Sequence, residues 1–92
     1  MKFDIGETVI CSVEVRNAAG TLVDPTTSMN VKINRIVPFA SVVSSTAMTP
    51  DTTGKYHYDF QTASLSPTNY RVIYTATDGT RITMATEEFS LE

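Results

Sequence analysis

One thiol and one imidazole, Cys11 and His57, are the residues of this chain that could form a nucleophile and its base. Such a pair must lie within hydrogen-bond reach to act. Cys11 alternates with polar residues in segment 8–16 and is expected on its buried face, together with three valines. His57 has the opposite parity to the tyrosines on either side of it and is expected to face solvent. The sequence therefore predicts a structural, buried thiol and no catalytic pair.

Acidic residues offer no clearer site. Zinc needs three or four ligands, and one Cys and one His on opposite faces cannot begin such a site. Calcium needs six to eight oxygens, and the acidic residues near predicted strand ends lack the dense spacing of an EF-hand loop. These residues are Asp4, Glu7, Asp24, Asp51 and Asp78. Glu87 and Glu88 are adjacent on a predicted strand, so they point to opposite faces and cannot act as paired carboxylates. We expect no catalytic residue, cofactor or metal.

Five aromatic residues, Tyr56, Tyr58, Phe60, Tyr70 and Tyr74, allow two interpretations. Aligned on an exposed face, Tyr56, Tyr58 and Tyr74 would form a flat platform on which sugars or extended peptides stack. Alternatively, the aromatic rings fill the space between two sheets, because a small sandwich needs large inward side chains. Their opposite-parity neighbours are charged or polar, which favours the core interpretation.

Composition narrows the class of protein. Ninety-two residues predict a single domain over 1–92. Seven basic and ten acidic residues give a net charge of -3 without a basic cluster, so no nucleic-acid partner is expected. Met1 to Asp4 does not resemble a signal peptide, and the longest apolar run contains Pro38 and is too short to cross a bilayer. A single cysteine leaves the compartment open. Residues 91–92 are interpreted as a possible expression-vector remnant.

Hydrophobic alternation places the strands. The clearest is Tyr70 to Thr77, which Asp78-Gly79 should turn back into a partner strand as a hairpin. Further strands are predicted at 3–5, 8–16, 21–23, 29–36 and 55–61, with a turn at 17–20 and dense turn chemistry at 49–54. Segment 37–45 is expected to be an edge strand or a crossover because it contains a proline. In 81–91 the apolar residues change parity, so a bulge near Thr86-Glu87 is expected.

About seven short strands without a helical stripe predict an antiparallel β-sandwich. The stretches 6–9, 17–25, 53–60 and 70–77 resemble the immunoglobulin-like modules of microbial surface proteins and bacteriophage structural proteins, and macroglobulin-type modules are similar. The resemblance implies a Greek-key sandwich in which Val72 faces Cys11 across the core and the hydroxyl of Tyr70 ties a loop to its strand. The chain departs from the immunoglobulin pattern because it has neither a second cysteine nor a tryptophan.

The resemblance further implies a non-catalytic spacer, display or adhesion domain of a larger surface or phage protein, in an extracellular, cell-surface or virion setting. Its partners would be protein neighbours in the same polypeptide or assembly, and an isolated domain is expected to be monomeric without inserting into a membrane. The alternative is a module that binds carbohydrate or another ligand through loop tips or the tyrosine patch.

Overall fold

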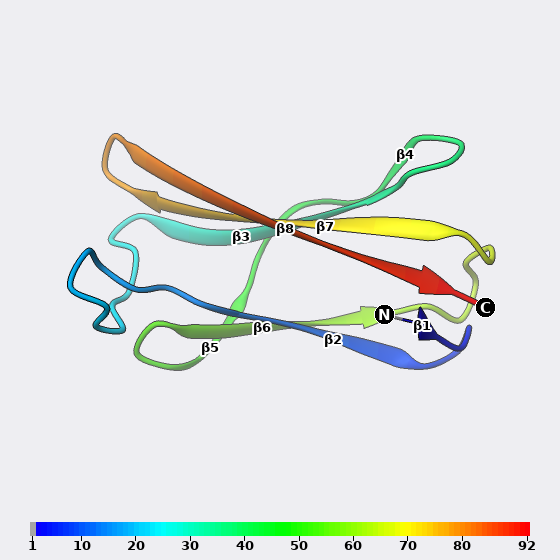
Figure 1. Cartoon of the computed structure of the whole chain (residues 1–92), viewed down its shortest axis with the longest axis horizontal. Coiled ribbons are helices and arrows are strands. Elements are labelled where there is room, and N and C mark those ends of the chain that lie inside the picture. Colours follow the sequence, from blue (N-terminus) through cyan, green and yellow to red (C-terminus); the bar gives the residue numbers. More distant parts are fainter. Residues whose placement is uncertain (1) are drawn as a thin grey trace.

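Two layers of β-strands make up the computed structural model, which describes residues 2–92 (Figure 1). No helix occurs in this range. The strands are β1 (Lys2–Phe3), β2 (Thr8–Glu14), β3 (Ser28–Arg35), β4 (Ala40–Ala47), β5 (Thr49–Thr52), β6 (Lys55–Gln61), β7 (Asn69–Asp78) and β8 (Arg81–Leu91). The larger sheet has the order β1-β8-β7-β3-β4 and the smaller one the order β2-β6-β5. The predicted all-β class and two-sheet architecture are confirmed.

One pairing departs from the antiparallel prediction. Strand β1 runs parallel to β8, with Lys2 opposite Ser90 and Phe3 opposite Leu91, whereas every other strand pair is antiparallel. The pairing also includes residues 91–92: Leu91 is buried, and the Glu92 amide donates to the Phe3 carbonyl at 2.9 Å. Of the two residues interpreted as a remnant, Leu91 therefore belongs to the sheet, and Glu92 hydrogen-bonds to its strand β1.

The predicted hairpin between β7 and β8 is confirmed. Its register runs without interruption from Asn69 opposite Ser90 to Asp78 opposite Arg81. Gly79 has a φ of 63°, and no residue other than glycine has a positive φ among those described. Asp78 therefore ends its strand, and the two-residue loop carries glycine at its first position, as a type II′ turn requires.

The bulge expected near Thr86-Glu87 is absent from this register, and that prediction was wrong. Strand β8 keeps one parity throughout, so Ile82 and Met84 lie on the outer face of the larger sheet, 64% and 62% exposed. All eight residues from Arg81 to Glu88 are exposed. Because this half of β8 is not covered, nothing forces its apolar residues to turn inward.

Most of segment 37–45 belongs to β4, which is an edge strand, and the crossover to the other sheet follows it. Strand β4 pairs only with β3 at the edge of the larger sheet. Met48 is then buried in the core. The chain crosses to the other layer and continues as β5 in the smaller sheet (Figure 1). The turn predicted at Thr49–Thr52 was wrong, since these residues form β5 and only residues 53–54 turn. All four residues are exposed, so no alternation marks the strand, and an edge position tolerates Pro50.

The turn predicted at 17–20 is confirmed. The Gly20 amide donates to the Asn17 carbonyl at 2.9 Å, and the Asn17 side chain accepts from the amides of Ala19 and Thr21 at 3.0 and 3.1 Å. The strand predicted at 21–23 shrinks to an isolated bridge between Arg16 and Leu22. The residue types at 17–20 therefore predicted the turn correctly. The chain that follows the turn makes only this short pairing before it leaves the sheet.

The core lies between the layers and is aromatic at one end. Phe60, Tyr70 and Phe89 form a triangle of rings with centroid separations from 5.6 to 6.4 Å. The other buried apolar residues are Val9, Cys11, Met29, Val31, Ile33, Met48, Val72, Tyr74 and Leu91. The inward parities predicted for β2, β3, β6 and β7 supply most of this set.

Candidate functional site

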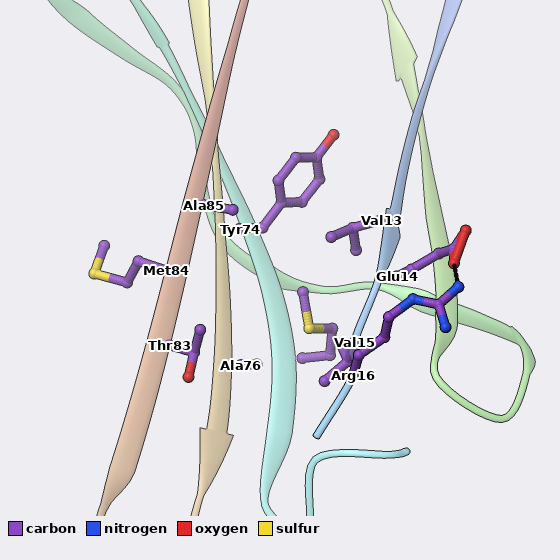
Figure 2. A pocket seen from close by; sticks show the side chains of 10 residues that line it. Val13, Glu14, Val15, Arg16, Tyr74, Ala76, Thr83, Met84 and Ala85 are labelled. Carbon is purple, nitrogen blue, oxygen red and sulfur yellow. Dashed lines mark hydrogen bonds and ion pairs between the residues drawn. The ribbon is translucent and has the colours of Figure 1, made fainter. Parts of the chain in front are cut away.

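A hollow of about 240 Å³ opens where the edge strand β2 faces the uncovered half of β8. Val13 of β2 and Val15, which follows that strand, line one side. Tyr74 and Ala76 of β7 lie at its base, and Thr83 and Ala85 of β8 line the other side. Figure 2 shows the two valines and the tyrosine pointing into the space between the strands. The hollow is a gap along one side of the sandwich.

Charge at the rim of this hollow is paired within the chain. Arg16 Nη2 lies 2.7 Å from Glu14 Oε2, and Arg16 Nη1 donates to the Gly20 carbonyl at 2.8 Å. Figure 2 shows this ion pair beside β2, with the side chain of Met84 on the far side of β8. The rim therefore presents no unsatisfied charge to a ligand, and the walls are mainly aliphatic.

A short chain of polar groups runs beside the hollow from Cys11 through Tyr74 to Glu87. The Tyr74 hydroxyl lies 3.2 Å from Glu87 Oε2 and also interacts with the Cys11 thiol. Burial raises the pKa of Cys11 to about 11, and the Glu87 carboxylate adds to that rise. Burial likewise raises the pKa of Tyr74. Both groups are protonated at neutral pH, so the thiol lacks the thiolate character that a nucleophile needs.

Cys11 and His57 lie apart, as their parities predicted. Cys11 is buried at 3% exposure, and its backbone neighbour on β6 is Tyr58, whereas His57 is opposite Ser12. His57 Nδ1 instead lies 2.6 Å from Asp51 Oδ1 on the adjacent edge strand β5. The imidazole thus joins β6 to β5 and does not approach the thiol.

The carboxylates near strand ends hold loops of this chain. Asp24 accepts from the Gly54 amide at 2.7 Å and from the Tyr56 hydroxyl at 3.0 Å. Asp78 accepts from the Thr26 hydroxyl, and Glu7 accepts from the Asp4 amide at 2.7 Å. Within residues 2–92 no three His, Cys, Asp or Glu side chains gather closely enough to hold a metal ion.

The three tyrosines of the possible platform do not share an exposed face. Tyr74 is only 2% exposed and belongs to the core. Tyr56 and Tyr58 are half-buried and pack against that core. The core interpretation is therefore confirmed for Tyr74, and an exposed row of all three rings does not form.

The hydroxyl of Tyr70 makes the contact that the resemblance implied. It donates to the carbonyl of Ser66, four residues upstream, at 2.8 Å. Tyr70 and Val72 are both 1% exposed, and Cys11 lies in the same core. The Cys11 thiol donates to the Val9 carbonyl at 3.9 Å and also interacts with the Tyr74 hydroxyl.

Sequence reasoning missed one surface feature, the uncovered edge of β8. The signal was present in the hairpin register: counting back from Asp78 and Arg81 places Ile82 opposite Thr77 and Met84 opposite Thr75. Those threonines have the outward parity of β7, so the apolar residues opposite them must also point outward. Apolar residues were expected to face inward, so the outward position of Ile82 and Met84 was not predicted.

Comparison with known proteins adds no relative. The chain matches no known protein family, no curated protein and no solved structure at a significant level. Among the described residues, no helix is long and apolar enough to cross a membrane.

Proposed function

We propose that this chain is an immunoglobulin-like, Greek-key β-sandwich that acts as a non-catalytic structural or interaction module, such as a spacer, display or adhesion domain of a larger surface or phage assembly. The observation that carries the proposal is the Tyr70–Ser66 hydrogen bond at the start of β7. It corresponds to the tyrosine corner of immunoglobulin-like sandwiches, in which a tyrosine near the start of the sixth strand bonds to backbone a few residues upstream.

Strand order supports the same assignment. The chain enters the smaller sheet at β2, leaves it for β3 and β4, returns for β5 and β6, and ends in the larger sheet with β7 and β8. Repeated exchange between sheets is typical of Greek-key sandwiches. The non-catalytic role is supported by the polar groups described above, since they are protonated by burial or hydrogen-bonded to the chain itself.

A second candidate, binding of a carbohydrate, has one observation in its favour. A hollow of about 300 Å³ on the smaller sheet is lined by Ser12, Val13, Glu14, Asp51, Lys55 and Tyr56. Hydroxyl, carboxylate and ammonium groups beside an aromatic ring are a combination that can hydrogen-bond and stack a sugar. Tyr56 already donates its hydroxyl to Asp24, which leaves only the ring available.

Titration of the isotope-labelled chain with a glycan panel and with calcium, followed by amide chemical shifts, separates the two candidates. The structural role predicts no saturable shifts at any residue. Saturable shifts confined to residues 12–14 and 51–56 would contradict it and support the carbohydrate module. The variant Lys55→Ala, which removes a charged group from this hollow, should then weaken binding while leaving the fold intact.

A further inference from the structure

The outer edge of β8 is unpaired over most of its length. Strand β1 covers only Ser90 and Leu91, and no described strand pairs with the other side of residues 81–89. Residues flanking a two-residue hairpin loop exchange their hydrogen bonds, and the pattern then alternates along the strands. The odd-numbered residues of β8 therefore bond to β7, and the amides and carbonyls of Ile82, Met84 and Thr86 face the free edge.

Exposed backbone of this kind is a template for another strand. Ile82 and Met84 add apolar surface on the outer face beside the same edge, and both are more than half exposed. Arg81 has no ion-pair partner within residues 2–92, and Glu87 is exposed on the inward parity of the same strand. The edge thus combines unpaired backbone amides and carbonyls, exposed apolar side chains, and a positive and a negative side chain six residues apart.

The charges fit a second copy of β8 in antiparallel orientation. Side chains directly opposite each other in an antiparallel pair lie on the same face, so paired residues must share parity. When Met84 lies opposite Met84 of the other copy, Ile82 is opposite Thr86, Thr83 is opposite Ala85, and Arg81 is opposite Glu87. In this register the residues facing the free edge are also the ones that would form the new hydrogen-bonded pairs. Two symmetry-related pairs of Arg81 with Glu87 then lie at the two ends of the paired segment.

The other sheet edges do not offer the same complementarity. Strand β4 contains no charged residue, and β5 contains Pro50, which cannot donate. In β2 the only charged residue is Glu14, which already pairs with Arg16. Strand β1 has only two residues, and its Lys2 pairs with Glu92. Among the free strand edges in residues 2–92, that of β8 is therefore the one whose sequence complements itself over several residues.

We propose that two copies of this chain associate through the outer edges of β8, joining their five-stranded sheets into one continuous sheet around a two-fold axis at Met84. Such an interface is isologous and closes on itself, which gives a dimer and not a filament. The proposal replaces the monomer expected from the sequence, and it is independent of the role assigned to the sandwich.

Sedimentation equilibrium of the full chain between about 10 µM and 1 mM tests the association, because this range brackets weak specific contacts. The wild-type chain should form dimers and nothing larger. Met84→Lys places two like charges opposite each other at the axis and should weaken association about tenfold or more. Ile10→Lys is the matched control, since Ile10 is equally exposed on the edge strand β2, and it should leave the dimer unchanged.

A charge swap tests the register. Arg81→Glu and Glu87→Lys should each weaken association, and the double variant should restore it because the pairs re-form with reversed sign. Circular dichroism checks that each variant is folded, which matters for Glu87 because it accepts from Tyr74. In addition, Met84→Cys should form an intermolecular disulfide under mild oxidation, since opposed residues of a hydrogen-bonded pair have Cα atoms about 5.5 Å apart.

Three results would overturn the proposal. The first is a wild-type chain that stays monomeric across the whole concentration range. The second is a dimer that survives Met84→Lys or is not rescued by the charge swap, which would place the interface elsewhere. The third is efficient cross-linking of Ile10→Cys in place of Met84→Cys, which would indicate pairing through β2, or growth beyond the dimer, which an isologous interface does not allow.

Discussion

The hydroxyl of Tyr70 holds the loop before β7 against the core through one hydrogen bond. Tyr70→Phe removes the bond to the Ser66 carbonyl and nothing else, and Ser66 is exposed enough for water to replace it. We expect a loss of about 1 kcal/mol in unfolding free energy. The melting temperature should fall by about 4–8 °C, as is usual for a domain of this size.

Tyr58→Phe is the matched control for Tyr70→Phe in the same thermal melt. Tyr58 is half-buried, and its hydroxyl has no hydrogen-bond partner in the part of the chain that the structure describes. Its removal should leave the melting temperature nearly unchanged. Equal shifts for the two variants would contradict a structural role for the Tyr70 hydroxyl.

Cys11 should behave as an inert thiol in the folded chain. Burial raises its pKa from the ordinary 9.0 to about 11, so the folded state keeps the thiol proton at pH values where the unfolded state has lost it. The unfolded state then binds fewer protons, and the unfolding free energy falls as pH rises from about 9 to 11. This contribution is fully present below pH 9. A chromogenic disulfide reagent at pH 8 should react slowly before denaturant is added and rapidly afterwards.

The variant Cys11→Ala isolates this part of the pH profile. It should lose the thiol's share of the fall between pH 9 and 11, while the share due to the tyrosines remains. Rapid labelling of the native chain at pH 8, or identical pH profiles for the two proteins, would show that Cys11 is accessible and not held in the core.

At the scale of elements, the turn between β5 and β6 is locked by close backbone contacts. Gly54 has a φ of 75°, its carbonyl accepts from the Val15 amide at 2.7 Å, and a Cβ added there would lie 2.8 Å from the Val15 carbonyl oxygen. The same Cβ would lie 2.9 Å from the backbone nitrogen of Val23. This turn therefore joins β6 to the loop that follows β2.

Gly54→Ala should destabilise the chain more than Gly79→Ala. Both residues have positive φ, so each substitution carries about 1 kcal/mol or more of backbone strain. Only at Gly54 does the new methyl group meet backbone atoms, because nothing lies within 4 Å of a Cβ at Gly79. We expect a loss of about 3 kcal/mol or more at Gly54, measured by urea denaturation. Equal losses would show that the turn is not packed against the loop that follows β2.

Strands that alternate could be predicted from the sequence, and strands that do not alternate could not. Segments 29–36, 55–61 and 70–77 carry one apolar face each, and the structure places strands there within a residue or two. Strand β5 was predicted as a turn because all its residues are exposed and include Pro50. The parallel pairing of β1 depends on contacts between distant ends of the chain, which local periodicity does not encode.

For the candidate site too, the features set by local alternation could be predicted, and those that depend on contacts between distant segments could not. Side-chain parity alone placed Cys11 and His57 apart and put Tyr74 in the core. The hollow between β2 and β8 could not be predicted, because it depends on how two strands far apart in the sequence face each other across the sandwich. The outward position of Ile82 and Met84 could have been predicted, since the Asp78–Arg81 hairpin fixes the register of the whole strand.

At the scale of the molecule, the chain is an elongated sandwich of about 39 × 23 × 19 Å with one open side. The two sheets share a single core that includes the ring cluster of Phe60, Tyr70 and Phe89. Beyond that core, the first part of β8, from Arg81 to Glu88, is exposed. The closed part accounts for stability, and the uncovered part is where another chain can be added without unfolding the first.

The most direct test of the account compares Val72→Ala with Ile73→Ala by chemical unfolding. The two residues are neighbours on β7 but point to opposite faces, Val72 into the core at 1% exposure and Ile73 outward and half-buried. Val72→Ala should lose about 2–4 kcal/mol through the cavity it leaves, whereas Ile73→Ala should lose about 1 kcal/mol. Equal losses, or a larger loss at Ile73, would contradict the two-layer core on which the whole account depends.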